Sequence, residues 1–134
     1  MFAAYNNPAS VYGRVAVETG IAAARPVELV IMLYEGAVET LTRAAAQMRS
    51  RDTAAKNESI TRAIRIIDEG LKATLDVRGG TLVATLDELY AYMIRRLLTA
   101  NLKNDPAMLD EVRTLLLELK GAWDQIADRP AKAP

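Results

Sequence analysis

Between Gly79-Gly80 and Asn104-Asp105-Pro106, apolar positions recur every three or four residues, the spacing of one buried helical face. A second apolar set lies beside that face, so we expect this helix to contact several neighbours, or one neighbour and a partner. The main face comprises Leu82, Leu86, Leu89, Met93, Leu97 and Ala100, and the second set comprises Val83, Tyr90, Ile94, Leu98 and Asn101. The rest of the chain is interpreted as packing around this helix.

Three further stretches carry the same periodicity, which predicts helices over residues 26–49, 53–78 and 106–128 in addition to 81–104. The first face holds Val30, Leu33, Ala37, Leu41, Ala44 and Met48, and the last holds Leu109, Val112, Leu116, Leu119, Trp123 and Ile126. The second helix has a bulky face of Ile60, Ile64, Ile67, Leu71 and Leu75, flanked by the shallower Ala63, Ile66, Gly70, Ala73 and Val77. Pro26 and Pro106 suit first helical positions, because a helix leaves the N–H of that position unbonded.

Short breaks between four such helices predict an all-α fold, an antiparallel up-down four-helix bundle. Residues 26–128 form this domain, and residues 129–134 are expected to be a disordered tail. Residues 1–25 lack helical periodicity, yet Val11, Tyr12, Val15 and Val17 make them too apolar for a solvated tail. We therefore expect an N-terminal arm that packs on the bundle.

Composition removes several classes of function. Lys plus Arg equals Asp plus Glu at 17 each, so the chain lacks the basic surplus that nucleic-acid binding needs. It contains no cysteine and no histidine, so neither a thiolate nor an imidazole can serve as nucleophile, base or metal ligand. We expect no metal, no cofactor and no enzymatic turnover. With no signal peptide and no apolar run that could span a bilayer, a soluble cytoplasmic protein without membrane insertion is expected.

The ordered set of short motifs resembles the flagellar export chaperone family FliS over roughly residues 10 to 127. It comprises Pro26-Val27-Glu28-Leu29, Met32 to Ala37, Lys56-Asn57, Gly79-Gly80, Leu89-Tyr90, Tyr92-Met93, Arg95-Arg96-Leu97, Ala100-Asn101, Asn104-Asp105 and Ala122-Trp123. One departure is Arg25 before Pro26, where the family usually carries a small hydroxyl residue.

The resemblance implies a chaperone without enzymatic activity. It would bind the C-terminal segment of flagellin in the cytoplasm, prevent premature polymerisation and aid delivery to the flagellar type III export apparatus, whose export gate is a further candidate partner. It also implies that the arm and the client compete for one surface of the bundle. A client that orders on binding would wrap a large apolar area at an entropic cost.

Candidate site residues follow from helical position together with this resemblance. The client-binding candidates are Tyr12, Val15, Ile66, Ala73, Leu86, Tyr90, Ile94, Arg96 and Asn101. The structural core is expected to include Leu33, Leu41, Ile64, Ile67, Leu89, Met93, Leu97, Leu116 and Trp123. Ordinary packing is an open alternative for Tyr90, a solvated face is one for Arg96, and a local turn contact is one for Asn101.

Two other classes remain open on the residues alone. A small helical enzyme of the chorismate mutase type would gather arginines such as Arg62, Arg65, Arg95 and Arg96 around a dianion. A generic helical adaptor or dimerisation module would show the same periodicity as a chaperone. An apolar surface groove without an inward-pointing arginine cluster would favour the chaperone over the enzyme.

Overall fold

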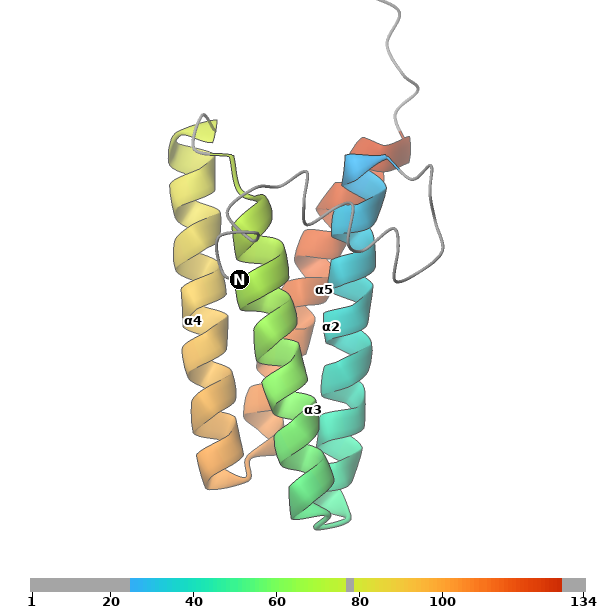
Figure 1. The fold of residues 1–134 in the computed structure, drawn as a ribbon, viewed down its shortest axis with the longest axis vertical. Helices are drawn as coiled ribbons and strands as arrows, with labels where there is room; N and C mark the ends of the chain where they lie inside the picture. The colour runs from blue at the N-terminus through green and yellow to red at the C-terminus, as the bar shows by residue number, and fades with distance from the viewer. Residues whose placement is uncertain (1–24, 77–78, 129–134) are drawn as a thin grey trace, which may run out of the picture.

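Four helical segments run alternately up and down the molecule in a computed structural model that describes residues 25–76 and 79–128 (Figure 1). They are α2 (Pro26–Arg49), α3 (Thr53–Arg65), α4 (Thr81–Lys103) and α5 (Pro106–Asp128), and α3 is prolonged by the short helices η2 (Ile66–Leu71) and η3 (Lys72–Thr74). The predicted all-α antiparallel bundle is confirmed. The predicted arm and C-terminal tail lie outside the described residues, apart from Arg25.

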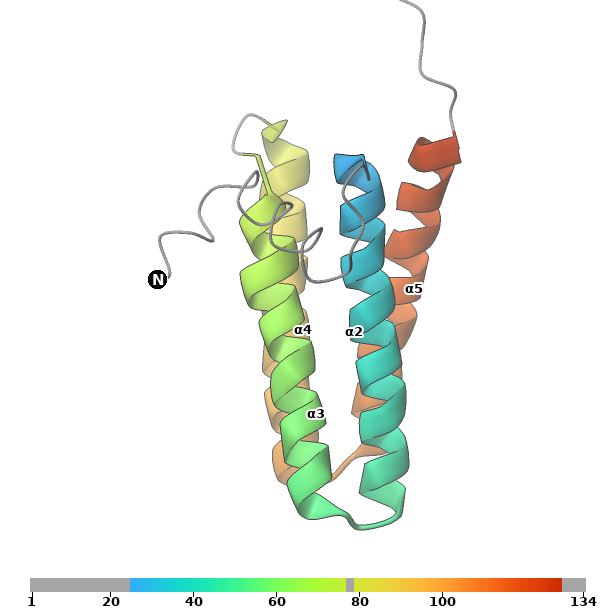
Figure 2. The same cartoon turned by 45° about the vertical axis from the view of Figure 1, so that its right-hand side comes forward.

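The helices form a ring in which α2 contacts α3 and α5, while α4 contacts the same two helices from the other side (Figures 1 and 2). At one end of the bundle the α2–α3 and α4–α5 connections are tight turns. At the other end, called the open end below, α2 and α4 begin and α5 finishes, and the residues after Thr74 lead from η3 into α4.

The start of α2 is better fixed than its Arg25 cap residue predicts. The Glu28 carboxylate accepts a hydrogen bond of 2.9 Å from the Arg25 main-chain N–H, which is one half of a capping box. The Arg25 guanidinium also donates to the main-chain oxygen of Ala127 at 2.8 Å. These contacts replace the missing hydroxyl cap and fasten the start of α2 to the end of α5.

The turns at the tight end use the predicted cap chemistry. The Asp52 carboxylate accepts from the main-chain N–H of Ala55 at 3.3 Å, and the Asp105 carboxylate accepts from that of Ala107 at 2.9 Å. Asn104 ends α4 in the left-handed conformation, with φ 53°, which asparagine tolerates better than most residues. Each turn therefore leads directly into the next helix.

The second helix departs from the expected regular helix over 53–78. Regular α-helix ends at Arg65, η2 is a π-helical turn in which the Lys72 N–H bonds the Ile67 carbonyl, and η3 is a 3₁₀ turn. Gly70 lies in η2 against Leu33 of α2, so closely that a Cβ there would come within 3.1 Å of the Leu33 side chain. The wider π turn accommodates an extra residue locally. The helical path then stops at Thr74, because Leu75 is extended.

The core runs the length of the bundle, with fully buried side chains from every long helix. Of the residues expected in it, Leu41, Ile67, Met93, Leu97 and Leu116 are buried, whereas Leu33, Ile64, Leu89 and Trp123 are partly buried and pack against the buried cluster. Tyr34, which the predicted face of the first helix omits, is fully buried.

Two positions assigned to buried faces are exposed instead. Leu82 keeps 66% of its surface exposed, and Ile126 keeps 47%. Both lie in end turns of their helices at the open end, Leu82 in the first turn of α4 and Ile126 in the last turn of α5. Periodicity identifies the face of a helix, but it does not show where along the helix the neighbours stop.

Candidate functional site

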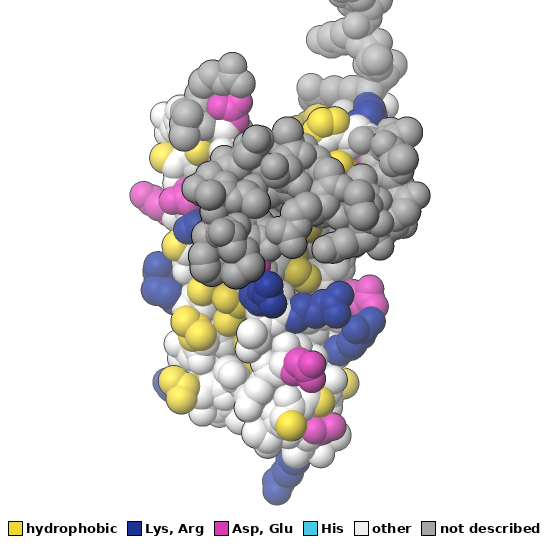
Figure 3. Space-filling view, in the orientation of Figure 1, with side chains coloured by type: hydrophobic (Ala, Val, Ile, Leu, Met, Phe, Trp, Pro, Cys, Tyr) yellow, Lys and Arg dark blue, Asp and Glu magenta, His cyan; other side chains and the backbone are white. Residues whose placement is uncertain are grey.

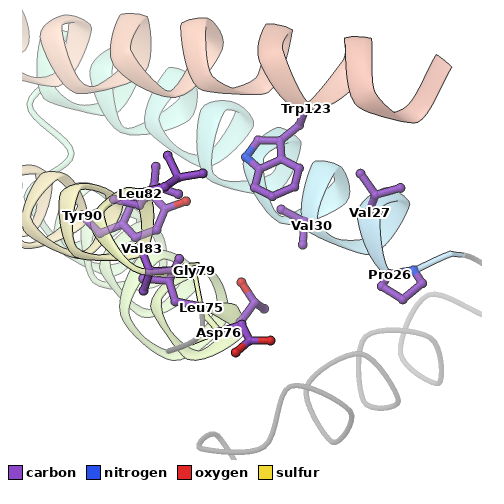
Figure 4. A pocket seen from close by; sticks show the side chains of 12 residues that line it. Pro26, Val27, Val30, Leu75, Asp76, Gly79, Leu82, Val83, Tyr90 and Trp123 are labelled. Atoms are coloured by element: carbon purple, nitrogen blue, oxygen red, sulfur yellow. The ribbon is translucent and has the colours of Figure 1, made fainter. Parts of the chain in front are cut away.

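An apolar cavity of about 650 Å³ occupies the open end of the bundle (Figure 4). Its walls come from the start of α2, the residues between η3 and α4, the start of α4 and the late part of α5. The lining comprises Pro26, Val27, Val30, Thr74, Leu75, Asp76, Gly79, Leu82, Val83, Leu86, Tyr90 and Trp123. A cavity of this size and composition is typical of sites that hold apolar groups.

Gly79 and Gly80 shape the wall where the chain enters α4. A Cβ on Gly79 would lie 2.2 Å from Cγ2 of Val83, so only glycine fits there without movement. Gly80 has a positive φ of 61° and immediately precedes α4. The predicted glycine exit is thus the entrance to α4, and it directs Leu82 and Val83 to the cavity.

Three aromatic side chains from three helices meet beside the cavity. The Trp123 indole N–H donates to the Tyr34 hydroxyl at 3.2 Å, and the Tyr34 and Tyr90 hydroxyls share a short hydrogen bond. The rings of Tyr34 and Tyr90 have their centroids 6.5 Å apart at 52°, a tilted pair of the kind that aromatic rings favour. The trio joins α2, α4 and α5, and Figure 4 shows Trp123 and Tyr90 facing each other across the cavity.

The two tyrosine hydroxyls keep their protons at neutral pH. Burial raises the pKa of Tyr34, and burial followed by the neighbouring Tyr34 raises the pKa of Tyr90 still further. Both groups are therefore hydrogen-bond donors and neither is a base.

Arg96 is engaged within the bundle. Its guanidinium bonds the Glu111 carboxylate through Nε at 2.8 Å and through a terminal nitrogen at 2.7 Å, and the Tyr92 hydroxyl donates to the same carboxylate. The Tyr92 hydrogen bond, followed by that of Arg96, lowers the pKa of Glu111. A client carboxylate would have to compete with Glu111 for Arg96.

Asn101 lies at the tight end, far along α4 from the cavity. Its main-chain oxygen accepts a hydrogen bond of 3.2 Å from the buried ammonium group of Lys56, which also donates to Oδ1 of Asn104 at 3.2 Å. The Asn101 side-chain oxygen is buried without a partner among the described residues. This oxygen could therefore accept a hydrogen bond from a further group.

The remaining candidates are distributed over different faces. Leu86 and Tyr90 line the cavity, whereas Ile66 and Ala73 are partly buried along η2 and η3, with Ile66 in contact with the position of Gly36 on α2. Ile94 is partly buried on α4. Tyr12 and Val15 lie outside the described residues.

A second apolar surface continues along α4 from the level of Ile94. Leu98 is 53% exposed and Leu102 is 89% exposed, at successive four-residue steps from Ile94, so the three share one side of the helix. Hydrophobic side chains also reach the surface on the α3–α4 side of the face shown in Figure 3. We call Ile94, Leu98 and Leu102 the α4 strip.

The described residues give no support to the enzyme alternative. Arg62, Arg65 and Arg95 are exposed, Arg96 is paired with Glu111, and no arginine lines the cavity. Within residues 25–76 and 79–128, no group of three or more His, Cys, Asp or Glu side chains is arranged to hold a metal ion. No helix in those ranges is long and apolar enough to cross a membrane. Fold and site together define an all-α bundle with an apolar cavity at one end.

Comparison with known proteins specifies the family. Residues 8–130 match the family model described as flagellar protein FliS. The chain is 46% identical over 119 residues to the flagellar secretion chaperone FliS of Salmonella typhimurium, covering 88% of each chain. It is 44% identical to FliSB of Pseudomonas aeruginosa, over 87% of this chain and 92% of that one, and 39% identical to FliS of Bacillus subtilis, over 91% and 87%. The chain therefore belongs to the FliS family of flagellar secretion chaperones, which is non-enzymatic, and the resemblance seen in its motifs is confirmed.

Sequence analysis missed Tyr34 as a part of the site. The signal was present, since Tyr34 follows Val30 by four residues and precedes Ala37 and Leu41 at helical spacing. No local sequence pattern, however, indicates that the Tyr34 hydroxyl bonds the Tyr90 hydroxyl and the Trp123 indole, which lie 56 and 89 residues away in the sequence.

Proposed function

We propose that this chaperone binds the C-terminal segment of flagellin in the cytoplasm, keeps it from polymerising, and delivers it to the flagellar export gate. The observation that carries the proposal is the open-end cavity, an apolar space of about 650 Å³ on a protein of the FliS family. A filament-forming segment must hide its apolar side chains before assembly, and this cavity offers them a cover.

The α4 strip supports an extended contact in addition to the cavity. From Leu82 at the cavity rim to Leu102, α4 rises by about 30 Å at 1.5 Å per residue. A single segment lying along α4 would contact the cavity, Ile94 and Leu98 in turn. Ile66, which lies near Gly36 of α2, and Ala73 belong to η2 and η3 and would be reached only by a client that also extends over these short helices.

The test is calorimetric titration of the chaperone with a C-terminal fragment of flagellin from the same organism. Leu82→Glu introduces a charge at the cavity rim, where the leucine is largely exposed in the free protein. A glutamate in the first turn of a helix suits the helix dipole, so folding should be preserved. We expect at least tenfold weaker binding, because burial of a leucine contributes roughly 1.5–3 kcal/mol.

Leu117→Glu is the matched control. Leu117 is 49% exposed on α5 and does not line the cavity, so this variant should bind as the wild type does. No measurable binding of the fragment by the wild type would refute the proposed function. Equal losses in both variants would mean that the cavity is not the binding site.

A further inference from the structure

Among the residues that the structure describes, the hydrogen bonds beside the cavity leave one proton without an acceptor. Trp123, Tyr34 and Tyr90 each carry one polar hydrogen, and the trio contains two hydrogen bonds, one between Trp123 and Tyr34 and one between the tyrosines. Indole N–H can only donate, so Tyr34 must accept from it. Whichever tyrosine donates to the other, one hydroxyl hydrogen remains.

We assign the hydroxyl hydrogen that has no acceptor to the tyrosine that a ligand in the cavity can contact. Tyr90 lines the cavity and Tyr34 does not, although both are at least 99% buried. No hydrogen bond within residues 25–76 and 79–128 gives either hydroxyl a further acceptor. If Trp123 donates to Tyr34 and Tyr34 donates to Tyr90, the hydrogen without an acceptor is that of Tyr90, whose side chain lines the cavity. The opposite order would leave it on Tyr34, which does not line the cavity, so an occupant of the cavity could not pair it.

We propose that the Tyr90 hydroxyl is a specificity-determining hydrogen-bond donor of the open-end cavity, which accepts a client segment presenting an uncharged acceptor next to a bulky apolar side chain. The inference rests on the proposed function and names the chemistry of the client at that site. Suitable acceptors are a main-chain carbonyl, such as those left free in the last turn of a helix, or an Asn or Gln side-chain oxygen.

The cavity lining explains why the acceptor is uncharged. The described lining residues include no lysine or arginine, and Asp76 is their one ionisable acid. A carboxylate brought into this space would lose its hydration without gaining a cation, which is costly. A carbonyl or amide oxygen loses less hydration and recovers one hydrogen bond from Tyr90.

The geometry also makes the donor selective. An apolar surface alone tolerates many apolar clients, whereas a buried donor that stays unpaired penalises any occupant without an acceptor. A fully aliphatic occupant would fill the cavity but leave the Tyr90 hydroxyl hydrogen without an acceptor. A segment that places a carbonyl at this point satisfies it.

The test compares Tyr90→Phe with Tyr34→Phe by calorimetric titration with the flagellin C-terminal fragment. Tyr90→Phe removes the donor and keeps the ring, so affinity should fall about three- to tenfold, as expected for one neutral hydrogen bond. Tyr34→Phe removes the neighbouring hydroxyl but leaves the Tyr90 proton free for the client, so affinity should stay within about twofold of the wild type. Tyr90→Phe removes the partner of Tyr34 in one hydrogen bond, and Tyr34→Phe removes the partner of both Trp123 and Tyr90, so both variants should lose stability.

The outcomes separate this inference from the proposed function. If the wild type binds and Tyr90→Phe binds with the same affinity, the donor role is overturned, since the Tyr90 hydroxyl would then make no hydrogen bond with the client. Equal losses in both variants would also overturn it, because the pair would then act only by shaping the cavity. Absence of binding by the wild type would instead refute the proposed function. Thermal unfolding of each variant, with helicity measured at the titration temperature, excludes loss of fold as the cause.

Discussion

The ammonium group of Lys56 lies 3.2 Å from the main-chain oxygen of Asn101 and joins the start of α3 to the last turn of α4. Lys56 is only 6% exposed, and its second hydrogen bond goes to Asn104, the left-handed residue that ends α4. A cation at the C-terminus of a helix also suits the helix dipole. Lys56, Asn101 and Asn104, which belong to the motifs that resemble the family, therefore hold the tight end together.

Lys56→Met tests this role. The methionine keeps the apolar stem but leaves two acceptors at the end of α4 without their donor, so the free energy of unfolding should fall by about 1–3 kcal/mol. The control is Lys103→Met, which replaces an exposed lysine in the last turn of α4. It should lower the free energy of unfolding by less than about 1 kcal/mol. Urea denaturation measures both. Client affinity should not change in Lys56→Met, and a large loss of affinity with full stability would assign Lys56 to the binding surface.

Glu111 should make the stability of the bundle depend on acid pH. Its hydrogen bonds with Tyr92 and Arg96 hold its pKa below the usual value, so the folded protein releases this proton more readily than the unfolded chain. The stabilisation is therefore complete above the unfolded pKa, near 4.3, and is lost as the pH falls through the folded-state pKa.

Denaturation of wild type and Glu111→Gln between about pH 2.5 and pH 7 measures this dependence. The difference in unfolding free energy between them should be constant at neutral pH and should shrink below about pH 4. The matched control is Glu118→Gln, at an exposed position of the same helix. This substitution should change the unfolding free energy little at any pH in the range. A difference that grows on acidification would contradict the assignment.

Gly79 and Gly121 should respond in opposite directions to alanine. A Cβ at Gly79 would collide with Val83 at 2.2 Å, so Gly79→Ala should destabilise the protein by about 1–3 kcal/mol as the start of α4 shifts. Gly121 lies inside α5 with nothing within 4 Å of its Cβ position, so Gly121→Ala should stabilise by about 0.5–1 kcal/mol. Chemical denaturation measures both, and Val83→Ala added to Gly79→Ala should recover part of the loss. Absence of any recovery would place the strain elsewhere.

The sequence predicts the bounds of three helices almost residue by residue, because proline, aspartate and asparagine mark their ends locally. The predicted range 26–49 is that of α2, 106–128 is that of α5, and α4 ends one residue before its predicted end. The second helix could not be predicted in the same way. Its π turn holds Gly70 close to Leu33 of α2, a contact between different helices that no local pattern encodes.

The cavity shows the same division between local and tertiary information. Leu86 and Tyr90 were expected at the client surface from their helical position, and both line the cavity. Tyr34 and Trp123 complete the aromatic trio through contacts that no local pattern encodes. Arg96 and Asn101 were reasonable candidates by position, but their main contacts, to Glu111 and Lys56, are decided by how the helices pack.

The N-terminal residues provide the last prediction, which rests on their sequence and on where the described chain begins. Pro26 and Val27, the first two residues of α2, line the open-end cavity. Tyr12, Val15 and Val17 are apolar enough to compete with a client for that surface. If they occupy it, only the fraction of molecules with a free surface can bind, and the apparent affinity is reduced accordingly.

Deleting residues 1–18 should therefore leave helicity unchanged and make binding of the flagellin fragment equal or tighter. The expected gain is small, because burial of a few side chains at roughly 1.5–3 kcal/mol each is offset by the entropy of ordering the segment. A synthetic peptide of residues 1–18, added to the truncated protein, should compete with the flagellin fragment in the same titration, and a scrambled peptide should not. A tenfold loss of affinity on truncation, with helicity intact, would show that these residues contact the client directly, since removing a competitor cannot weaken binding.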